Sequence, residues 1–259
     1  MKRLNQPITG NDWPGLRVWL IGASTGIGAA LAQALAAQGA HLTLSARNAE
    51  AVSTVAARCR MLKNSTDIHS MPVDVCDRSA MKAAIEQIRD RWQGLDLVIF
   101  NAGSYDPVRI DTLSAKLANQ SLTVNLLAPI DTTAELLPLI LSMPEDGRPR
   151  GFAYVASVAG YRGLPRALTY GPGKAGLNSF AESLWIDLNP MQLNAWIINP
   201  GFVRTRLTDQ NDFKMPALIE PEEAAQAIID GFSQGVFEIH FPKRFTRFMK
   251  LMRILPISW

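Results

Sequence analysis

The sequence predicts a single α/β domain built on one doubly wound, parallel sheet of about seven strands with helices on both faces. Three observations support this fold class. Short apolar runs alternate with helix-length amphipathic stretches along the 259 residues. A glycine-rich turn joins the first apolar run to the first helical stretch. No segment in the middle of the chain has the composition of a linker, so we expect residues 1–259 to share one core.

The predicted strands are short and apolar, as expected where both faces of a parallel sheet are covered. They span 17–22, 41–46, 68–73, 95–103, 151–157, 194–199 and 236–241. The helices predicted between them span 26–38, 49–59, 79–92, 113–141, 170–188 and 221–234. Residues 1–16 form an extension before the first strand. Ligands bind outside the carboxyl ends of such strands, so we expect functional residues just after them.

Composition and charge exclude several classes of function. The chain has 26 basic and 23 acidic residues, and five of the basic ones lie in the last 17 positions, which contain no acid. The remainder carries 21 basic against 23 acidic residues, a charge of −2, which does not suit a nucleic-acid binder. The two cysteines and three histidines fit neither a metal site nor a disulfide framework, so we expect no metal and a reducing, cytoplasmic location. Because no run of about 18 uncharged apolar residues is present, we expect neither secretion nor a membrane span.

The first strand ends in the turn "GASTGIG", which opens the first predicted helix. Glycines at this junction let the backbone approach a pyrophosphate, which is held by the free N–H groups and positive end of the helix. The alternative is a plain glycine-rich turn, but the flanking strand and helix favour a dinucleotide. The predicted phosphate-binding residues are Gly22, Ser24, Thr25, Gly26, Ile27 and Gly28.

The end of the second strand predicts which dinucleotide is bound. Ser45 stands where an NAD-specific protein would have an acid for the ribose hydroxyls, and Arg47 follows. A guanidinium holds a 2′-phosphate that a carboxylate would repel, so we expect NADP(H) to be preferred over NAD(H). The alternative for Arg47 is a solvated loop residue.

Two further strand ends supply candidate cofactor contacts. Asp74, after the third strand, could accept a hydrogen bond from the adenine amine, or could simply form a turn. Asn101, Ala102 and Gly103 close the fourth strand with small residues that let a ribose pass near the backbone.

Tyr170 and Lys174 lie one helical turn apart, on one face of the helix predicted over 170–188. At about 4 Å and an effective dielectric of roughly 20, their attraction would be worth about 4 kcal/mol, or some 3 pK units. We therefore expect the phenol pKa to fall toward neutrality, where an acid–base catalyst works best. The "GPG" between them predicts that the helix begins close to Tyr170, because proline and glycine are tolerated in a first turn. The alternative is an exposed helix pair.

Asn125 lies inside the helix predicted over 113–141, and Pro129 follows four residues later. Since proline has no N–H, the carbonyl of residue 125 loses its helical partner and a kink is expected. The freed carbonyl could hold a water in the site, or the kink could serve packing alone.

The sequence resembles the short-chain dehydrogenase/reductase family in several motifs taken together. These are Gly22, Gly26 and Gly28, "NAG" at 101–103, Asn125, Ser157, "Y-x-x-x-K" at 170–174 and "P-G-x-V-x-T" at 200–205. The resemblance covers about residues 17–205 and implies a Rossmann-like fold and an oxidoreductase acting on carbonyl or alcohol groups. It also assigns roles to the matching residues. Tyr170 would exchange the proton, Ser157 would bond the substrate oxygen, Lys174 would bind the nicotinamide ribose, and Asn125 would hold a relay water. Pro200, Gly201, Val203 and Thr205 would cover the nicotinamide and hold its carboxamide.

The resemblance implies a homodimer or homotetramer that pairs through helices 113–141 and 170–188. It also leaves a second function open, that of a catalytically silent NADP-binding sensor or scaffold. Against this, every proton-handling position of the family is filled.

Two segments beyond these motifs bear on the substrate and partners. Residues 204–220 have no strong period and indicate a mobile substrate lid, with Phe213, Met215, Leu218 and Ile219 as an apolar wall for a hydrophobic ketone or aldehyde, or as packing onto the body. Residues 243–259 predict a basic amphipathic helix. Its partner could be an anionic membrane surface, a neighbouring subunit or the protein's own core. On this helix Phe245, Phe248, Met249 and Met252 share one face, and Arg244, Arg247, Lys250 and Arg253 lie toward the other.

Overall fold

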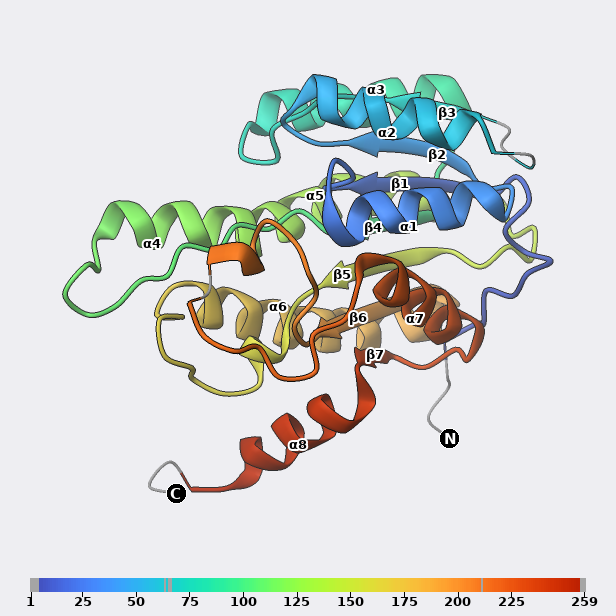
Figure 1. Cartoon of the computed structure of the whole chain (residues 1–259). Helices are drawn as coiled ribbons and strands as arrows, with labels where there is room; N and C mark the ends of the chain where they lie inside the picture. Colours follow the sequence, from blue (N-terminus) through green and yellow to red (C-terminus); the bar gives the residue numbers. More distant parts are fainter. Residues whose placement is uncertain (1–4, 63, 65–66, 211, 257–259) are drawn as a thin grey trace.

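The computed structural model describes residues 5–62, 64, 67–210 and 212–256, which form a seven-stranded parallel sheet flanked by helices (Figure 1). The strand order is β3-β2-β1-β4-β5-β6-β7, and the predicted fold class is confirmed. The strands are β1 Arg17–Ile21, β2 His41–Ser45, β3 Ile68–Ser70, β4 Leu97–Phe100, β5 Gly151–Val155, β6 Asn194–Pro200 and β7 Glu238–Phe241. All seven lie within about three residues of the predicted bounds. The main differences are that β3, β4 and β5 end earlier than predicted, and β4 and β7 begin later.

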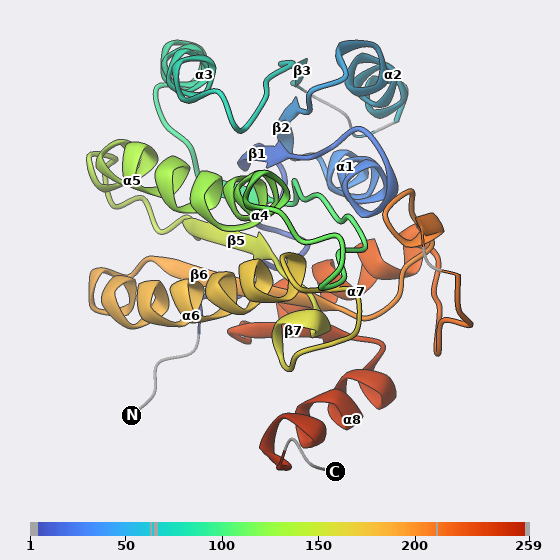
Figure 2. The same cartoon turned by 90° about the vertical axis from the view of Figure 1, so that its left-hand side faces the viewer.

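The helices form two layers, one on each face of the sheet (Figure 2). One layer contains α1 Gly26–Ala37, α2 Ala49–Arg60 and α7 Pro221–Ser233. The other contains α3 Arg78–Trp92, α4 Ala115–Leu122, α5 Ala128–Leu141 and α6 Tyr170–Leu188. The chain runs from β1 outward to β3 and then returns to place β4 on the other side of β1. This reversal opens a crevice at the carboxyl ends of β1 and β4, which is where such sheets bind ligands.

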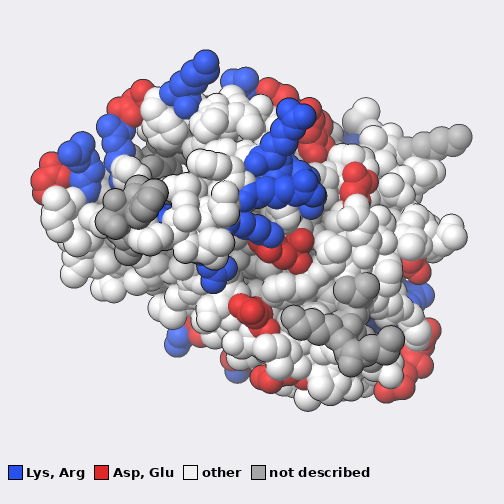
Figure 3. Space-filling view, turned by 90° about the horizontal axis from the view of Figure 1, so that it is seen from below, with Lys and Arg blue, Asp and Glu red and all other residues white. Residues whose placement is uncertain are grey.

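The two ends of the described chain both pack on the body. In the N-terminal extension, Ile8 and Trp13 are buried, and the N–H of Ile8 donates to the carbonyl of Phe232 at 3.0 Å. The predicted tail forms α8, Lys243–Ile254, below the sheet edge, and residues 257–259 of the predicted tail lie outside the described residues, as do residues 1–4 of the extension. Seen from below, Lys and Arg side chains gather over α8 (Figure 3).

The predicted helix over 113–141 is not one α-helix. Between α4 and α5 the chain forms a π segment, Thr123–Leu127, in which the N–H of Ala128 donates to the carbonyl of Thr123. Pro129 then lies in the first turn of α5, where its missing N–H is tolerated. The wider turn thus accommodates the proline, in place of the predicted kink of an α-helix. By length and composition alone the run Ala115–Leu141 could cross a membrane, as buried core helices of other folds also could, and 39% of its most apolar window is buried.

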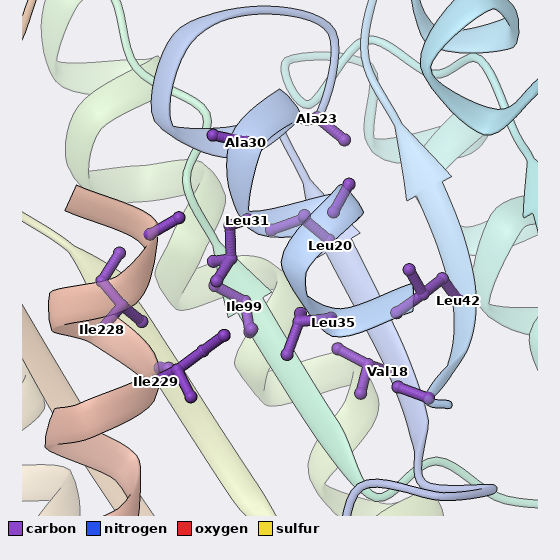
Figure 4. Close-up of a cluster of buried hydrophobic side chains, with 14 of the residues drawn as sticks. Val18, Leu20, Ala23, Ala30, Leu31, Leu35, Leu42, Ile99, Ile228 and Ile229 are labelled. Atoms are coloured by element: carbon purple, nitrogen blue, oxygen red, sulfur yellow. The ribbon is translucent and has the colours of Figure 1, made fainter. Parts of the chain in front are cut away.

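Two apolar clusters hold the layers on the sheet. In the first, Leu31 and Leu35 of α1 and Ile228 of α7 pack on Leu20 and Ile99 of the central strands (Figure 4). The second cluster fills the opposite face under α3, α5 and α6. Because β1 and β4 are buried on both faces, the residues that follow them are held firmly at the edge of the crevice.

Candidate active site

A cavity of about 1520 Å³ runs along the carboxyl ends of the strands. It is bounded by the turn after β1, the ends of β2 to β6, and the loop that follows β6. Of the predicted site residues, Gly28 and Asn125 do not line it. The predicted residues that do line it are Gly22, Ser24, Thr25, Gly26, Ile27, Arg47, Asp74, Asn101, Ala102, Gly103, Ser157, Tyr170, Lys174, Pro200, Gly201, Val203 and Thr205.

The turn after β1 is built from glycines because no side chain fits there. Gly22 has φ +91°, and a Cβ at this position would lie 2.4 Å from the backbone nitrogen of Ala102. A Cβ on Gly28 would lie 2.0 Å from the carbonyl oxygen of Gly22, which already accepts a hydrogen bond from Asn101 Nδ2 at 2.7 Å. The predicted role of Gly28 is therefore indirect, since it lets α1 pack tightly against the turn.

The N-terminus of α1 opens onto the cavity without a side-chain cap. Thr25 is the N-cap residue in an extended conformation, and its side chain makes no capping hydrogen bond. The first-turn N–H groups of a helix have no partners within the helix, and an anion satisfies them. The donor set of this turn therefore fits a dinucleotide phosphate.

The end of β2 differs from the sequence prediction in one residue. Ser45 is buried, and its hydroxyl accepts a hydrogen bond from Trp19 Nε1 at 2.9 Å, so it does not face the cavity. Ala46, Arg47 and Asn48 line the cavity instead, and Arg47 is exposed. The sequence reasoning missed Ala46, because strand alternation decides which residue of a pair points outward. None of these four residues is acidic.

Asp74 forms the turn that was one of its two predicted alternatives, and it also lines the cavity. Its Oδ1 accepts a hydrogen bond from the N–H of Cys76 at 3.0 Å, which is a turn-forming contact, and the residue is half-buried on the cavity wall.

The structure brings Tyr170, Lys174 and Ser157 together. Tyr170 is the first residue of α6, and Ser157 follows β5 as the N-cap of a short 3₁₀ turn, Val158–Gly160. Lys174 Nζ lies 5.6 Å from the centroid of the Tyr170 ring and donates to the carbonyl of Val155 at 2.8 Å. Ser157 Oγ accepts a hydrogen bond from the N–H of Ala159 at 3.1 Å, and its side chain is close enough to the Tyr170 phenol to influence its pKa. The helix start at Tyr170 agrees with the prediction from the "GPG" sequence.

Burial controls the protonation of this group. Desolvation raises the pKa of Tyr170 to about 12, against a lowering by the Ser157 hydrogen bond and a further raising by Tyr105. Desolvation also lowers the pKa of Lys174 to about 7. The expectation that the phenol pKa falls toward neutrality is wrong for this structure. The cost of burying the two groups is the larger effect here, and it outweighs the attraction between their charges.

Asn125 lies behind the site and does not line the cavity. It is fully buried, and its Nδ2 donates to the carbonyls of Ser104 and Ser121 at 2.8 and 2.9 Å. A Cβ on Gly103 would lie 3.2 Å from Asn125 Oδ1 and 3.4 Å from Lys174 Nζ. The asparagine side chain thus joins the loop after β4 to the helical layer, a structural role that the sequence did not indicate.

Comparison with known proteins identifies the family. The sequence pattern of the family described as short chain dehydrogenase matches residues 17–215, which is more than half of the chain. The chain belongs to this family. Short-chain dehydrogenases are oxidoreductases that act on CH–OH or C=O groups with a nicotinamide dinucleotide.

Two curated relatives extend over most of this short-chain dehydrogenase. An uncharacterized oxidoreductase of Myxococcus xanthus is 30% identical over 236 residues, which cover 91% of this chain and 90% of the relative. The 11-beta-hydroxysteroid dehydrogenase-like 4A of Arabidopsis thaliana is 31% identical over 232 residues, covering 85% of this chain and 74% of the relative.

Solved structures share the fold of this short-chain dehydrogenase. A Pseudomonas aeruginosa RhlG/NADP active-site complex superposes with a TM-score of 0.80 at 24% identity, covering 90% of this chain and 97% of that one. A short-chain dehydrogenase/reductase from Burkholderia phymatum in complex with NAD gives 0.83 at 18% identity, covering 93% of each chain. At these identities the likeness concerns the fold alone.

The loop after β6 bounds the cavity of this short-chain dehydrogenase opposite the glycine turn. Gly201 donates its N–H to the carbonyl of Phe241 at 2.7 Å, and Val203 forms an isolated bridge with Ile219. Thr205 lies against the turn after β1, because a Cβ on Gly26 would come within 2.7 Å of its Cγ2. The predicted lid over 204–220 is thus tied down at both ends.

The described part of the lid is held over the cavity by two polar contacts. Arg166 forms an ion pair with Asp212, and Gln210 Nε2 donates to the carbonyl of Tyr105 at 3.0 Å. Tyr105, which the sequence reasoning missed, also packs its ring edge on Tyr170 with centroids 5.2 Å apart.

The apolar wall differs from the prediction. Phe213 lines the cavity, but Met215, Leu218 and Ile219 do not. Ile219 instead packs against the first apolar cluster, so for this residue the packing alternative holds. The sequence reasoning missed four residues of the wall, because three of them come from outside the predicted lid. These missed residues are Phe202, Pro216, Phe245 and Met249.

The inner face of α8 contributes to this wall. The Phe202 ring lies 5.7 Å from Phe213 and 5.6 Å from Phe245, centroid to centroid. On the inner face of α8 itself, Met249 is buried and Thr246 is fully buried. Of the three partners left open for the tail, the protein's own core is therefore one. A repeating apolar face in the tail was the available signal, although it does not say which surface the face covers.

Proposed function

We propose that the protein is an NADP(H)-dependent oxidoreductase of a hydrophobic carbonyl or alcohol, with Tyr170 as the general acid–base. One observation carries this proposal. The half-buried Tyr170 and Ser157 and the buried Lys174 line the same cavity as an uncapped, glycine-built helix N-terminus. This arrangement would place a proton donor in the same cavity as a dinucleotide-binding turn.

The residues around the cavity fit the cofactor. The turn from Gly22 to Gly28 would hold the pyrophosphate, and Arg47 would hold a 2′-phosphate at the end of β2. The absence of an acid at residues 45–48 supports NADP(H) over NAD(H). Asp74 would bind the adenine, Asn101, Ala102 and Gly103 would flank a ribose, and Lys174 would bind the nicotinamide ribose. Pro200, Gly201, Val203 and Thr205 would cover the nicotinamide and hold its carboxamide. When bound, the nicotinamide supplies or accepts the hydride.

The protonation states favour proton donation by Tyr170. A phenol with a pKa of about 12 is protonated at neutral pH, which is the form that gives a proton to a carbonyl oxygen during reduction. Ser157 would bond the same oxygen and orient the substrate. Lys174, with a pKa of about 7, can take up and release a proton near the working pH beside the phenol. Asn125 would act as a positioning residue, and the proposed relay water at its carbonyl follows from the family resemblance.

The lining supports a hydrophobic substrate. Phe202, Phe213, Phe245 and Met249 form an apolar wall of the cavity that Tyr170 also lines. The name of the Arabidopsis relative, which refers to a hydroxysteroid dehydrogenase, supports the same class of substrate.

Assembly and location are part of the proposal. Leu127 and Leu141 at the ends of the π segment and α5, and Ile186 on α6, are exposed apolar residues on the helices expected to pair, which supports a homodimer or homotetramer. The two cysteines fit neither a disulfide framework nor a metal site, which supports a cytoplasmic location. A peripheral position on a membrane is compatible with this location.

The test is turnover by Tyr170→Phe. NADPH absorbance is followed against a panel of hydrophobic ketones, aldehydes and β-ketoacyl thioesters. The variant should lose about 10³-fold in kcat because it lacks the proton donor, and it should still bind NADPH as measured by fluorescence. Turnover that survives the substitution would contradict the mechanism. NADPH binding without turnover of any substrate by the unsubstituted protein would favour the silent sensor or scaffold.

A further inference from the structure

The outward face of α8 carries both cations and apolar side chains. Arg244 and Arg247 are exposed, and Phe248, Leu251 and Ile254 are 56%, 53% and 77% exposed. At 100° per residue, these five positions fall within about one third of the helix circumference. The predicted apolar face is therefore divided, since Phe248 is exposed whereas Phe245 and Met249 line the cavity. An exposed aliphatic and aromatic stripe on a surface helix marks an interaction site.

The charges on this face lack acidic partners. Within the part of the chain that the structure describes, neither Arg244 nor Arg247 forms an ion pair, whereas Lys250 pairs with Glu238 at 2.6 Å. Residues 243–259 contain no Asp or Glu. Figure 3 shows the resulting gathering of Lys and Arg side chains on the underside of the molecule. The surface therefore suits an extended negative partner.

Several polar contacts hold the helix in this orientation. Lys250 is anchored to β7 through Glu238, and His240 Nδ1 lies 2.6 Å from Thr246 Oγ1. Arg162 donates to the carbonyls of Leu255 and Pro256 at 3.0 and 2.9 Å. Because these contacts involve the inner side of α8 and the residues that follow the helix, they orient its outer face without covering it.

We propose that the outward face of α8 is a peripheral membrane-binding surface for anionic phospholipid, with Arg244 and Arg247 at the headgroups and Phe248, Leu251 and Ile254 inserted at the boundary with the acyl chains. Apolar and cationic groups on one face are the composition of an interfacial helix. A second copy is the less suitable partner. In a two-fold dimer the same face meets itself, which would bring the arginines of both chains together.

This position would serve the cavity. The inner face of α8 supplies Phe245 and Met249 to the cavity wall, and a helix with its side chains is about 10 Å thick. A protein bound through the outer face would hold the apolar end of its cavity about 10 Å from the membrane surface. A lipid-soluble substrate could then enter without crossing bulk water.

The experiment is flotation of the full chain with lipid vesicles, which does not depend on enzymatic activity. Vesicles of phosphatidylcholine are compared with vesicles of phosphatidylcholine mixed with phosphatidylglycerol. The unsubstituted protein should float with the anionic vesicles only, and less so at high salt. The double variant R244E/R247E should bind at least about 30-fold more weakly, since each cation near the surface contributes roughly a factor of five. The double variant F248S/L251S should also lose binding.

The matched control is R58E/K82E, which changes two exposed cations on α2 and α3 by the same charge. It should retain binding to the anionic vesicles. The proposal is overturned if the unsubstituted protein does not float with them, or if the control loses binding as strongly as R244E/R247E. It is also overturned if F248S/L251S leaves flotation unchanged and lowers the molecular mass in solution, because the face would then join two copies of the chain.

Discussion

Lys174 is the residue on which the protonation of the site depends most. It is 3% exposed, and its Nζ donates to the carbonyl of Val155, so its ammonium form has lost almost all contact with water. The same burial keeps Tyr170 protonated at neutral pH. Both side chains therefore take up a charge less readily than they would in water. A neutral Tyr170 is the form that can donate a proton at the start of a reduction.

The burial of Lys174 predicts a pH dependence of stability. Its pKa falls from 10.5 to about 7 on folding, so between these pH values the unfolded chain binds more protons than the folded one. The free energy of unfolding therefore rises with pH through this window, and the cost of burial is largest below pH 7. Lys174→Met, which has no charge to bury, should be more stable than the unsubstituted protein by up to about 4 kcal/mol below this window.

The measurement is chemical denaturation of both proteins across the pH range. The stability difference should shrink as the pH rises from 7 toward 10.5. Lys82→Met, at an exposed position of α3, should show no such trend. If the difference in free energy of unfolding between Lys174→Met and the unsubstituted protein is the same at every pH, burial does not lower the pKa of Lys174.

Arg47 is the residue expected to set cofactor preference. Arg47→Ser removes the guanidinium proposed to clamp the 2′-phosphate, which is a charge-assisted contact of about 1.5–3 kcal/mol. The KM for NADPH should therefore rise about 10- to 100-fold, while that for NADH changes little. Steady-state kinetics with both cofactors give this comparison, with Arg58→Ser on α2 as the control. If the KM for NADPH is the same before and after the change, Arg47 is a solvated loop residue that does not contact the cofactor.

At the scale of elements, the junction of β1 and α1 has the least tolerance for change. Three backbone segments meet there, because Gly22 lies under Ala102 and α1 packs on the turn through Gly28. Gly28→Ala would place a Cβ 2.0 Å from the Gly22 carbonyl oxygen, so the turn must move. We expect a loss of about 3 kcal/mol in the free energy of unfolding and weaker dinucleotide binding.

Thermal unfolding and cofactor titration of Gly28→Ala test this expectation. Gly10→Ala is the matched control, since a Cβ there has no heavy atom within 4 Å and the backbone has no positive φ. Equal melting temperatures and equal cofactor affinities for the two variants would mean that the turn tolerates a side chain at residue 28.

The helical run from α4 to α5 illustrates how an element absorbs a local conflict. Pro129 cannot donate a hydrogen bond, and the chain responds with a π turn over Thr123–Leu127 that contains Asn125. The asparagine side chain is then directed to the carbonyls of Ser104 and Ser121. The sequence indicated the conflict and its position, but several backbone conformations can accommodate a proline, so the sequence alone did not predict the π turn.

At the scale of the whole molecule, a chain of hydrogen bonds joins α8 to the catalytic helix. Glu238 on β7 accepts from Lys250 at 2.6 Å and from Asn199 at 2.9 Å. Asn199 also donates to Asn178 Oδ1 at 2.8 Å, and Asn178 Nδ2 donates to the carbonyl of Lys174 at 2.9 Å. The position of α8 is thus coupled through the sheet edge to the helix that begins at Tyr170.

Glu238→Gln tests this connection. Replacing the carboxylate leaves Lys250 without its counterion and weakens a partly buried network, so we expect the free energy of unfolding to fall by about 2 kcal/mol. Hydrogen exchange should also rise in Lys243–Ile254. The control is Glu182→Gln, an exposed carboxylate on α6 that should leave both measurements unchanged. Unaltered exchange in α8 would show that Glu238 does not hold it.

The sequence by itself determined the fold, the positions of the strands and most of the residues that line the cavity. This was possible because apolar periodicity, the glycine turn and the motifs after the strands are local, and parallel strands bring their carboxyl ends to one edge. Gly22, Tyr170 and Lys174 could each be assigned to that edge from the chain alone.

Only the tertiary structure decided the direction of the pKa shifts, the exclusion of Ser45 and Asn125 from the cavity wall, and the part that α8 plays in it. Each of these depends on contacts between segments far apart in the chain. Desolvation of Lys174 is set by what surrounds it, and the partner of an apolar helix face such as that of Phe245 and Met249 is set by the surface it meets. A local sequence pattern predicts neither the desolvation of a side chain nor the surface that a helix face contacts.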